Sequence, residues 1–388
     1  NQGDMRRLIG ITPQENVFRE QERISAMIRS GKVEYFHIRK PDFTEMQMRD
    51  YLSHFDADVR KQLSLHDHHR LAVEMNIGGV HLNGRNPNPP ENFGGRISRS
   101  CHSVDEVLQC KNKVDYCFLS PIFDSISKQG YCSKFSLAEL KRLFDEKVLD
   151  EKVCALSGVT FDNIGQLEDV GFSSFVMLSA LWELPRTMFI SHQNARFDYV
   201  SGCKEAFRGG IRFVQLRMKD ASDDEVVEIA KILRPECDKY AALLTVDDRI
   251  NLLYSGLFDG VHLGKNDMPI AEAKKLTGDK FLLGATCNTA EDVFAAISDG
   301  ADYIGMGPFR FTTTKKNLSA ILGLEGYSNI MQKLQSRGMK MPVYAIGGIT
   351  VDDLENLKQT GIYGVAISSV ILDSQNPNDT IKQILKTF

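Results

Sequence analysis

The chain has 388 residues and a formal net charge of −4, so it is long enough for two domains of ordinary size or for one large barrel with insertions. The nearly balanced charge, without a basic block, argues against nucleic acid as the main partner. No apolar run approaches the roughly 18 residues that a membrane-spanning helix needs, so we expect no membrane partner and a cytoplasmic location.

Cysteine use and the first residues bear on the compartment. The eight cysteines show no CxxC pairing, and most lie in or near apolar segments. Reduced structural thiols are favoured over the alternatives of a zinc site or a disulfide framework. Residues 1–5 lack the charged-then-apolar build of a signal peptide, and we expect Met5 to be the native start.

The first half of the chain alternates short apolar runs with helix-like stretches. Helices are expected at 18–30, over 44–63 as one helix, from 70, at 137–149, and after 162. Another begins at Ser103, where Glu106 three residues later completes a capping-box pattern. Strands are predicted at 7–12, 34–39, 63–66, 79–82, 96–100, 116–120, 153–156 and 174–178.

The second half repeats this order. Gly-Val-His-Leu occurs at 79–82 and again at 260–263, and Ser-Gly-Val-Thr at 157–160 is matched by Gly-Gly-Ile-Thr at 347–350. Eightfold β–α alternation is the pattern of a parallel barrel. We therefore predict an α/β protein of two tandem (β/α)8 TIM barrels, with domains 5–183 and 186–388. The second set of strands is expected at 188–191, 213–216, 242–246, 260–263, 281–284, 303–305, 343–346 and 364–367.

Three polar residues alternate after the second strand of the second barrel. Gln215, Arg217 and Lys219 should share one face, which must be the barrel interior. An arginine and a lysine there need an anionic partner, and a phosphorylated ligand is the simplest one. The alternative is an internal salt bridge with Asp220 or Asp247.

Carboxylates follow the next two strands. Asp247 and Asp248 come after the third strand and Asp267 after the fourth. The C-terminal ends of barrel strands meet at one mouth, so these carboxylates beside a phosphate site suit Mg²⁺. Helix capping is the structural alternative for any one of them.

Two further stretches could bind anions. Residues 305–316 run from an apolar strand through a proline into three threonines and two lysines, which fits either an anion-binding loop or a polar surface turn. Gly347 and Gly348, with Ser368 and Ser369, match the phosphate site that barrels often build after strands seven and eight.

Together these motifs resemble thiamin phosphate synthase over about residues 185–388. The family joins a pyrimidine pyrophosphate to a thiazole phosphate and expels pyrophosphate, which implies phosphorylated small-molecule partners and Mg²⁺. The resemblance implies that Arg217 and Lys315 act in catalysis. It implies that the pyrimidine pyrophosphate is held by Gln215, Arg217 and Lys219, the metal by Asp248 and Asp267, and the thiazole phosphate by Thr312, Thr314, Gly348, Ser368 and Ser369.

Two positions depart from the family pattern. Asp247 stands where the family usually has Asn, and Thr286 where it has Ser; both are kept as expected substrate-binding positions. Ionisation of the pyrimidine pyrophosphate needs its developing negative charge stabilised, which Mg²⁺ and the cationic side chains can supply. The aminopyrimidine ring stabilises the resulting cation, so no protein nucleophile is expected.

The first barrel carries different residues at its mouth. Pro41 stands where the second barrel has Lys219, and Asn86 where it has Asp267, while 120–128 lacks the threonine–lysine loop. Binding of pyrophosphate and magnesium should therefore be weak or absent. Gly158 and Ser179 preserve the expected monophosphate site.

A histidine after the fifth strand distinguishes this barrel. His102, within Ser-Cys-His-Ser at 100–103, resembles the catalytic histidine of the thiazole tautomerase (TenI) branch of the same superfamily, over about 5–183. The implied reaction shifts a proton in a thiazole carboxylate phosphate, and histidine gives and takes protons near neutral pH. The combined interpretation is a bifunctional thiamin-biosynthesis enzyme.

Several alternatives stay open. His66, His68 and His69 could form a metal site or a partly exposed loop, whereas His81 and His262 are interpreted as scaffold. The first barrel could be a regulatory or ligand-sensing module without turnover. A phosphosugar isomerase is disfavoured by the magnesium-type carboxylates, and a homo-oligomer is one outcome for the assembly state.

Overall fold

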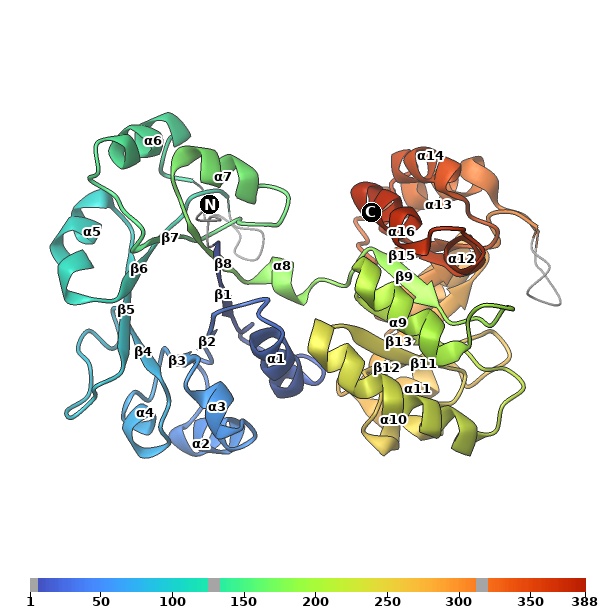
Figure 1. The fold of residues 1–388 in the computed structure, drawn as a ribbon, viewed down its shortest axis with the longest axis horizontal. Helices are drawn as coiled ribbons and strands as arrows, with labels where there is room; N and C mark the ends of the chain where they lie inside the picture. Colours follow the sequence, from blue (N-terminus) through green and yellow to red (C-terminus); the bar gives the residue numbers. More distant parts are fainter. Residues whose placement is uncertain (1–5, 125–132, 312–319) are drawn as a thin grey trace. The chain divides into compact units, whose positions relative to one another are not determined.

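A computed structural model describes residues 6–124, 133–311 and 320–388. Its contacts divide the chain into two compact units, Asn1–Glu183 and Leu184–Phe388. Each unit is a closed parallel barrel of eight strands, with helices outside the ring (Figure 1). The predicted fold of two tandem (β/α)8 barrels is confirmed. In the described residues, no helix has the length and apolar character needed to cross a membrane.

The strands of the first barrel pair in chain order, and β8 closes the ring by pairing with β1. The strands are β1 Arg7–Ile11, β2 Tyr35–Ile38, β3 Leu63–Leu65, β4 Gly79–Leu82, β5 Arg96–Cys101, β6 Tyr116–Leu119, β7 Val153–Ala155 and β8 Ser174–Met177. The helices are α1 Glu20–Arg29, α2 Glu45–Ser53, α3 Ala57–Arg60, α4 Arg70–Glu74, α5 Val104–Cys110, η1 Lys111–Lys113, α6 Leu137–Asp145, α7 Ile164–Val170 and α8 Ser179–Trp182.

The second barrel follows the same order, and β16 closes on β9. Its strands are β9 Thr187–Ile190, β10 Phe213–Leu216, β11 Leu243–Asp247, β12 Gly260–Leu263, β13 Leu282–Cys287, β14 Tyr303–Met306, β15 Val343–Ile346 and β16 Gly364–Ile367. Its helices are α9 Tyr199–Gly209, α10 Asp223–Tyr240, η2 Ile250–Ser255, α11 Ile270–Thr277, α12 Ala290–Asp299, α13 Gly323–Ser336, η3 Val351–Asp353, α14 Leu354–Gln359, α15 Ser369–Leu372 and α16 Pro377–Thr387.

Helix α10 illustrates why these sequences cover a barrel. Ser222 and Glu225 form a reciprocal capping box at its start. The buried residues follow at helical spacing, so one stripe faces the strands. Fully burying a side chain of the size of Val or Leu stabilises the fold by about 1.5–3 kcal/mol. The buried stripe is Val226, Ala230, Leu233 and Cys237.

Two local predictions in the first barrel need correction. The single helix predicted over 44–63 is wrong: α2 ends at Ser53, and α3 begins only after Asp56, whose backbone is extended. Between them Phe55 enters the core, 2% exposed, which a continuous helix would not allow. The capping box at Ser103 is half formed: the Ser103 hydroxyl accepts from the Glu106 N–H, but the Glu106 carboxylate accepts from the N–H of His102.

The strand registers give matched positions in the two barrels. Leu65 of β3 pairs with Val80, and Val246 of β11 pairs with Val261, so the Gly-Val-His-Leu strands are equivalent. Counting from these pairs equates strands across the two halves residue by residue. The matched positions used below are His37/Gln215, Arg39/Arg217, Lys40/Met218, His66/Asp247, Asp67/Asp248, His81/His262, Asn86/Asp267, Ser100/Thr286 and His102/Asn288.

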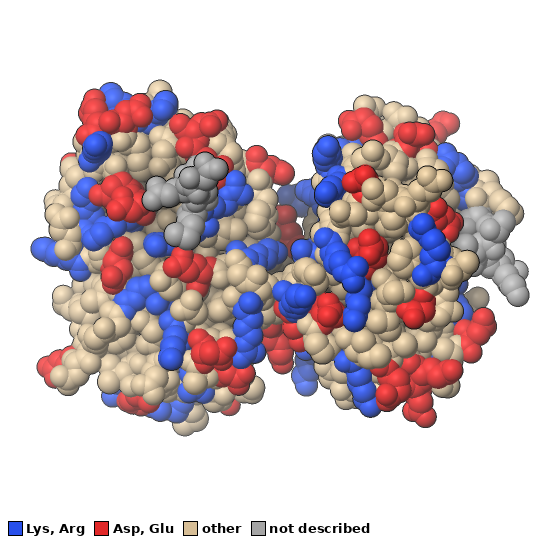
Figure 2. Space-filling model, in the orientation of Figure 1, with Lys and Arg blue, Asp and Glu red and all other residues tan. Residues whose placement is uncertain are grey.

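Charged side chains lie over the surface of each unit, and the thiols of the described residues lie inside. Basic and acidic side chains are interspersed over the face of each unit that Figure 2 shows. The cysteines of the described residues are buried and free of disulfides. Three of them gather behind β5 and β6, where the Cys101 and Cys110 sulfurs lie 3.3 Å apart with Cys117 beside them.

Candidate active sites at the mouths of the two barrels

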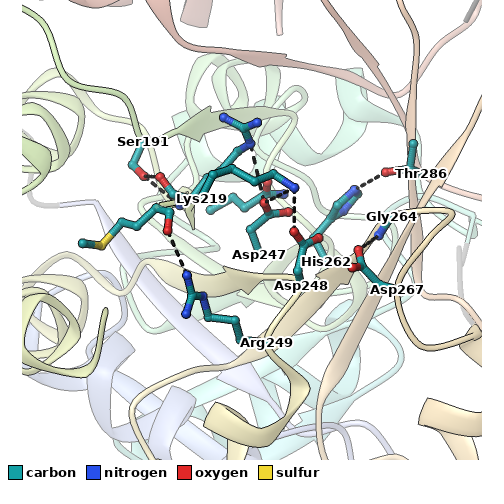
Figure 3. Close-up of polar contacts among 12 residues, drawn as sticks. Ser191, Lys219, Asp247, Asp248, Arg249, His262, Gly264, Asp267 and Thr286 are labelled. Carbon is teal, nitrogen blue, oxygen red and sulfur yellow. Dashed lines mark hydrogen bonds and ion pairs between the residues drawn. The ribbon is translucent and has the colours of Figure 1, made fainter. Parts of the chain in front are cut away.

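Cations and carboxylates meet at the mouth of the second barrel. Gln215 lies in the interior, 3% exposed, while Arg217 and Lys219 follow β10 toward the mouth. The Lys219 Nζ lies 2.6 Å from an Asp248 oxygen and 3.7 Å from Asp247, and the Arg217 Nε lies 3.5 Å from Asp247 (Figure 3). The salt bridge with Asp247 therefore exists, but the two cationic side chains remain 28% and 48% exposed and can still meet an anion.

Two side chains hold the backbone at and after Arg217. The Ser191 hydroxyl, after β9, accepts from the Arg217 N–H at 2.7 Å and donates to its carbonyl at 3.0 Å. Beyond it, the Arg249 guanidinium donates to the carbonyls of Met218 and Ala221 (Figure 3). The loop that carries Lys219 is thus fixed by hydrogen bonds at both ends.

A left-handed turn presents the carboxylates. Asp248 has φ of +65°, a conformation that Asp tolerates better than most residues, and its N–H donates to the His262 carbonyl at 2.8 Å. Asp267 accepts from the Gly264 N–H at 2.7 Å and shares a hydrogen bond with Asp248. The capping alternative is wrong for all three aspartates, since η2 and α11 are preceded by Arg249 and Pro269.

The crowding of these groups changes their proton affinity. Burial, and then the neighbouring Asp248 charge, raises the pKa of Asp247 to about 7. Burial, with the hydrogen bond to Asp248, raises the pKa of Asp267 to about 6. Partial burial opposes ionisation of Asp248, but hydrogen bonds from Asp267 and Lys219 hold its pKa below the usual value. The three carboxylates therefore resist carrying full negative charge together, and a bound cation would relieve this repulsion.

The donor set fits Mg²⁺. Asp248 and Asp267 offer carboxylate oxygens at an open mouth, which is the ligand type that Mg²⁺ takes together with phosphate oxygens and water. Gly264 lies close against one of these carboxylates. A Cβ on Gly264 would lie 2.9 Å from Asp267 Oδ2, so a side chain there would displace the Asp267 carboxylate.

The glycine turn for which phosphate binding is expected follows β15. Gly347 and Gly348 have φ of +101° and +64°, values that favour glycine. Arg310, four residues after the end of β14, donates to the Gly348 carbonyl at 2.7 Å and pairs with Asp353 at 2.8 Å. Ser368 and Ser369 stand at the start of α15, and Ser369 and Gly348 are exposed. The predicted ligands Thr312, Thr314 and Lys315 lie outside the described residues.

The first barrel keeps the left-handed turn after its seventh strand and lacks the neighbouring pair of carboxylates after its third and fourth strands. Ser157 and Gly158 have φ of +84° and +66°, and Ser179 begins α8, as Ser369 begins α15. At the position matching Asp248, however, the Asp67 carboxylate is held by both Arg85 guanidinium bonds, at 3.0 and 3.1 Å, and by Asn86 at 3.2 Å. The carboxylate that matches Asp248 is thus paired with an arginine in the first barrel.

Comparison with known proteins identifies the family. The family model for thiamine monophosphate synthase (TMP-TENI) matches residues 8–181 and again 187–371. The chain belongs to this family. The family resemblance predicted from the sequence is confirmed.

Individual relatives agree with the family model. The chain is 47% identical over 197 residues to a thiamine-phosphate synthase of Bacteroides fragilis, covering 51% of this chain and 97% of that protein. It is 39% identical over 201 residues to one of Flavobacterium psychrophilum, covering 52% and 98%. A solved thiamine phosphate pyrophosphorylase from Pyrococcus furiosus is 32% identical, with 52% of this chain and 94% of that chain covered and a TM-score of 0.46.

Within this family fold, His102 stands at the mouth of the first barrel. It is exposed, follows β5 directly, and its Nδ1 lies 3.3 Å from the hydroxyl of the buried Ser120 at the end of β6. At the matched place Asn288 donates to the Gly307 carbonyl at 2.6 Å. The two family domains therefore share a contact between these strand ends, but only the first offers a proton-transferring group there.

Thr286, one of the expected substrate-binding positions, contacts a histidine of the barrel interior. Its hydroxyl lies 2.9 Å from the His262 Nε2 (Figure 3). The His262 Nδ1 lies 3.1 Å from the Tyr303 hydroxyl. Ser100 makes the same contact with His81 at 2.7 Å in the first barrel. A histidine–hydroxyl pair is thus part of the shared interior, as the scaffold interpretation of the two histidines predicted.

The alternative in which His66, His68 and His69 together bind a metal is not supported, because the three rings do not form a common group among the described residues. His68 turns away, and its Nε2 lies 2.7 Å from the Phe43 carbonyl. Among the described residues, His66 instead gathers with His37 and His81 inside the barrel. The match of His37 to Gln215 in the repeated strands could have placed His37 in the interior from sequence alone.

Proposed function

We propose that the second barrel couples a hydroxymethylpyrimidine pyrophosphate to a thiazole phosphate, giving thiamin phosphate and pyrophosphate. The observation that carries this proposal is the meeting of Arg217 and Lys219 with Asp248 and Asp267 at one mouth. A cationic and metal-binding site suits pyrophosphate, and the neutral loop at Gly348 suits a monophosphate. Family membership supports the same reaction.

The residues of the chain divide the work of this reaction. Arg217 and Lys219 bind the pyrophosphate and stabilise the charge that develops as its C–O bond breaks. Asp248 and Asp267 would hold Mg²⁺, which supplies further neutralisation of that charge when bound. The thiazole nitrogen then forms the new C–N bond. Thr312, Thr314 and Lys315 keep the roles that the family resemblance implies.

The phosphate loop supplies position rather than charge. The left-handed pair Gly347 and Gly348, braced by Arg310, offers a backbone surface next to Ser368 and Ser369. A monophosphate bound there would set the thiazole ring against the pyrimidine, and such positioning is worth a large part of a bimolecular barrier. Thr286 is best assigned to the interior that supports the mouth, through His262.

We propose that the first barrel aromatises a thiazole carboxylate phosphate by proton transfer. His102 is the acid–base group, supported by its exposed position and its contact with Ser120. The Ser157–Gly158 turn and Ser179 are the proposed phosphate site. The second candidate is ligand binding without turnover, which the retained phosphate turn beside the arginine-filled carboxylate position would also support.

The synthase proposal is tested by mixing both substrates with Mg²⁺ and measuring thiamin phosphate. Asp248→Asn keeps the left-handed turn and removes one metal ligand, so product formation should fall by about 10²–10³-fold. The matched control Asp67→Asn in the first barrel should leave coupling unchanged. Absence of product with the wild-type protein, or equal effects of the two variants, would overturn the proposal.

The tautomerase proposal needs its own substrate. The non-aromatic thiazole tautomer should convert faster with protein than in buffer, and His102→Ala should lose this acceleration while coupling by the second barrel continues. Asn288→Ala, at the matched place, should not affect tautomerisation. If the wild-type protein binds the thiazole carboxylate phosphate without accelerating conversion, the binding-module candidate replaces this proposal.

A further inference from the structure

Three histidines converge inside the first barrel, outside the residues proposed for either reaction. His37 lies on β2, His66 directly after β3, and His81 on β4, with exposed fractions of 0%, 6% and 0%. The His37 Nδ1 is 2.9 Å from the His66 Nε2, and the His66 and His81 rings stack with centroids 4.2 Å apart. One ring nitrogen from each residue lies within 4.8 Å of the other two.

The surroundings of this cluster suit neutral imidazole. The hydrogen-bond partners of its outer nitrogens are hydroxyl groups: Tyr116 lies 2.7 Å from the His37 Nε2, while Ser98 and Ser100 flank His81 at 2.8 and 2.7 Å. No carboxylate appears among the hydrogen-bond or ion-pair partners that the described residues give these rings. Neutral imidazole is the form that binds transition metals.

The barrel fold does not require three histidines here. At the matched positions the second barrel has Gln215, Asp247 and His262, and it closes with the same strand order. The first barrel therefore has imidazoles at two positions where the second barrel buries an amide and a carboxylate. The cluster is a feature of this barrel rather than of the framework that the two barrels share.

We propose that His37, His66 and His81 form a binding site for one divalent transition-metal ion of the Zn²⁺ class inside the first barrel. Zn–N bonds of about 2.0–2.1 Å in a tetrahedral site place nitrogens about 3.3 Å apart, so the 2.9 Å pair of His37 and His66 opens by a few tenths of an ångström. The His66 and His81 rings are stacked 16° from parallel, so binding also requires these rings to tilt until both lone pairs point at the ion. His81 exchanges one serine hydroxyl for the ion.

The outer contacts favour such a site. With its Nε2 held by Tyr116, His37 keeps Nδ1 directed at His66, which is the arrangement in which a second partner fixes the ring of a metal ligand. Three nitrogen ligands leave a fourth position for water or another small ligand. Nitrogen donors select Zn²⁺ or Co²⁺ over Mg²⁺, so this site is chemically distinct from the carboxylates of the second barrel.

The test titrates the full-length, chelator-treated protein with Co²⁺ in excess Mg²⁺, which occupies the carboxylate site. We expect one Co²⁺ per chain, with the visible absorption of a four- or five-coordinate ion, and displacement by one equivalent of Zn²⁺. His54→Gln, which changes an exposed histidine of the same barrel, should bind identically. The site is independent of the proposed tautomerisation, because binding is read without substrate.

Two kinds of variant probe the assignment. His37→Gln introduces the residue of the matched position in the second barrel, and His66→Gln removes a second ligand. Each of these two single variants should abolish the absorption band while Trp182 fluorescence remains native. Tyr116→Phe keeps the ligands and should weaken binding by about 10–100-fold. Absence of stoichiometric Co²⁺ in the wild-type protein, or an unchanged band in both histidine variants, would overturn the proposal and leave a hydrogen-bonded structural cluster.

Discussion

The two barrels share the same order of strands and differ in the hydrogen-bond and ion-pair partners of one matched carboxylate. In the second barrel Asp248 contacts Lys219 and Asp267 at the mouth. In the first barrel the matched Asp67 is taken up by a bidentate pair with Arg85. The comparison teaches that a barrel can keep an acidic residue at a matched position and still change its partner, because an arginine from a neighbouring loop supplies the positive charge.

The phosphate turn shows the opposite behaviour. Both barrels have two successive left-handed residues after the seventh strand, Ser157 with Gly158 and Gly347 with Gly348. Serine is an unfavourable choice for this conformation, yet the turn is kept in the first barrel. The turn after the seventh strand is therefore the more constant part of the repeated fold, and the carboxylate contacts after the third and fourth strands are the part that diverges.

The largest expected effect concerns a buried ion pair that only the first barrel has. The Lys40 Nζ lies 2.9 Å from Glu20, both side chains are at most 1% exposed, and the matched residue in the second barrel is Met218. Lys40→Met leaves the Glu20 carboxylate buried without its cation, which should lower the free energy of unfolding of the first barrel by about 3–5 kcal/mol.

Trp182 reports on this barrel alone. It is the only tryptophan of the chain, and it packs edge-on against Phe36 at 5.7 Å. Its fluorescence during urea unfolding should show the loss, and the double variant Lys40→Met with Glu20→Gln should recover part of it. A single variant as stable as the wild type would mean that the barrel interior tolerates the unpaired carboxylate.

The next prediction compares matched arginines at the mouths of the two barrels. Arg217 and Arg39 occupy matched positions, and each backbone is held by a hydroxyl from the first strand, Ser191 or Thr12. Arg217→Ala should lower kcat/KM for thiamin phosphate formation by about 10²–10³-fold, since a donor to the developing charge is lost. Arg39→Ala should leave it unchanged, and comparable losses in both variants would contradict a pyrophosphate site confined to the second barrel.

A smaller effect should appear equally in both barrels. Thr286→Val and Ser100→Ala each remove a hydroxyl partner from a histidine Nε2. Leaving a buried polar group unsatisfied costs about 1–3 kcal/mol, so each barrel should lose stability by that amount in metal-free protein. Calorimetry or hydrogen exchange can measure the two losses, and a large difference between them would show that the histidine–hydroxyl pair is not an equivalent support.

The sequence predicted the repeated order of strands better than it predicted contacts between strands within each barrel. Most strand positions followed from apolar runs, since most strands are short and buried on both faces, whereas β5 is polar and only partly buried. The break after Ser53 was missed because helical spacing alone does not show that Phe55 must enter the core. The His37–His66–His81 cluster was missed because its members lie on or directly after three different strands and far apart in sequence. The sequence-based hypothesis grouped His66 with its neighbours in sequence, His68 and His69.

The smallest mutational effect concerns the brace of the phosphate turn. Asp353 pairs with Arg310, whose side chain is 48% exposed, so the pair contributes no more than about 1 kcal/mol. Asp353→Asn should raise KM for the thiazole phosphate by no more than about fivefold and leave kcat nearly unchanged. A large loss of kcat would assign the brace a role in the chemical step.

The same brace gives a pH prediction. Partial burial opposes ionisation of Asp353, but hydrogen bonds from Arg310 and Thr350 lower its pKa. As the pH falls, the unfolded chain takes up this proton first, so the contribution to stability is present above about pH 4 and is lost as the pH falls through the lower folded value. Amide exchange at Thr350 should therefore be constant from neutral pH down to about 5 after correction for intrinsic rates, and rise only in stronger acid.

The left-handed turn at Asp248 limits how such a barrel can diverge. Because few residues adopt φ near +65° readily, substitution at this position favours Asn or Gly over other side chains. In the first barrel the positive φ falls one place later, at His68, so Asp67 is free of this restriction. Among relatives, an Asn at the position of Asp248 would therefore mark a domain that has kept the turn and given up a ligand. A bulkier residue there would mark a domain whose turn has shifted.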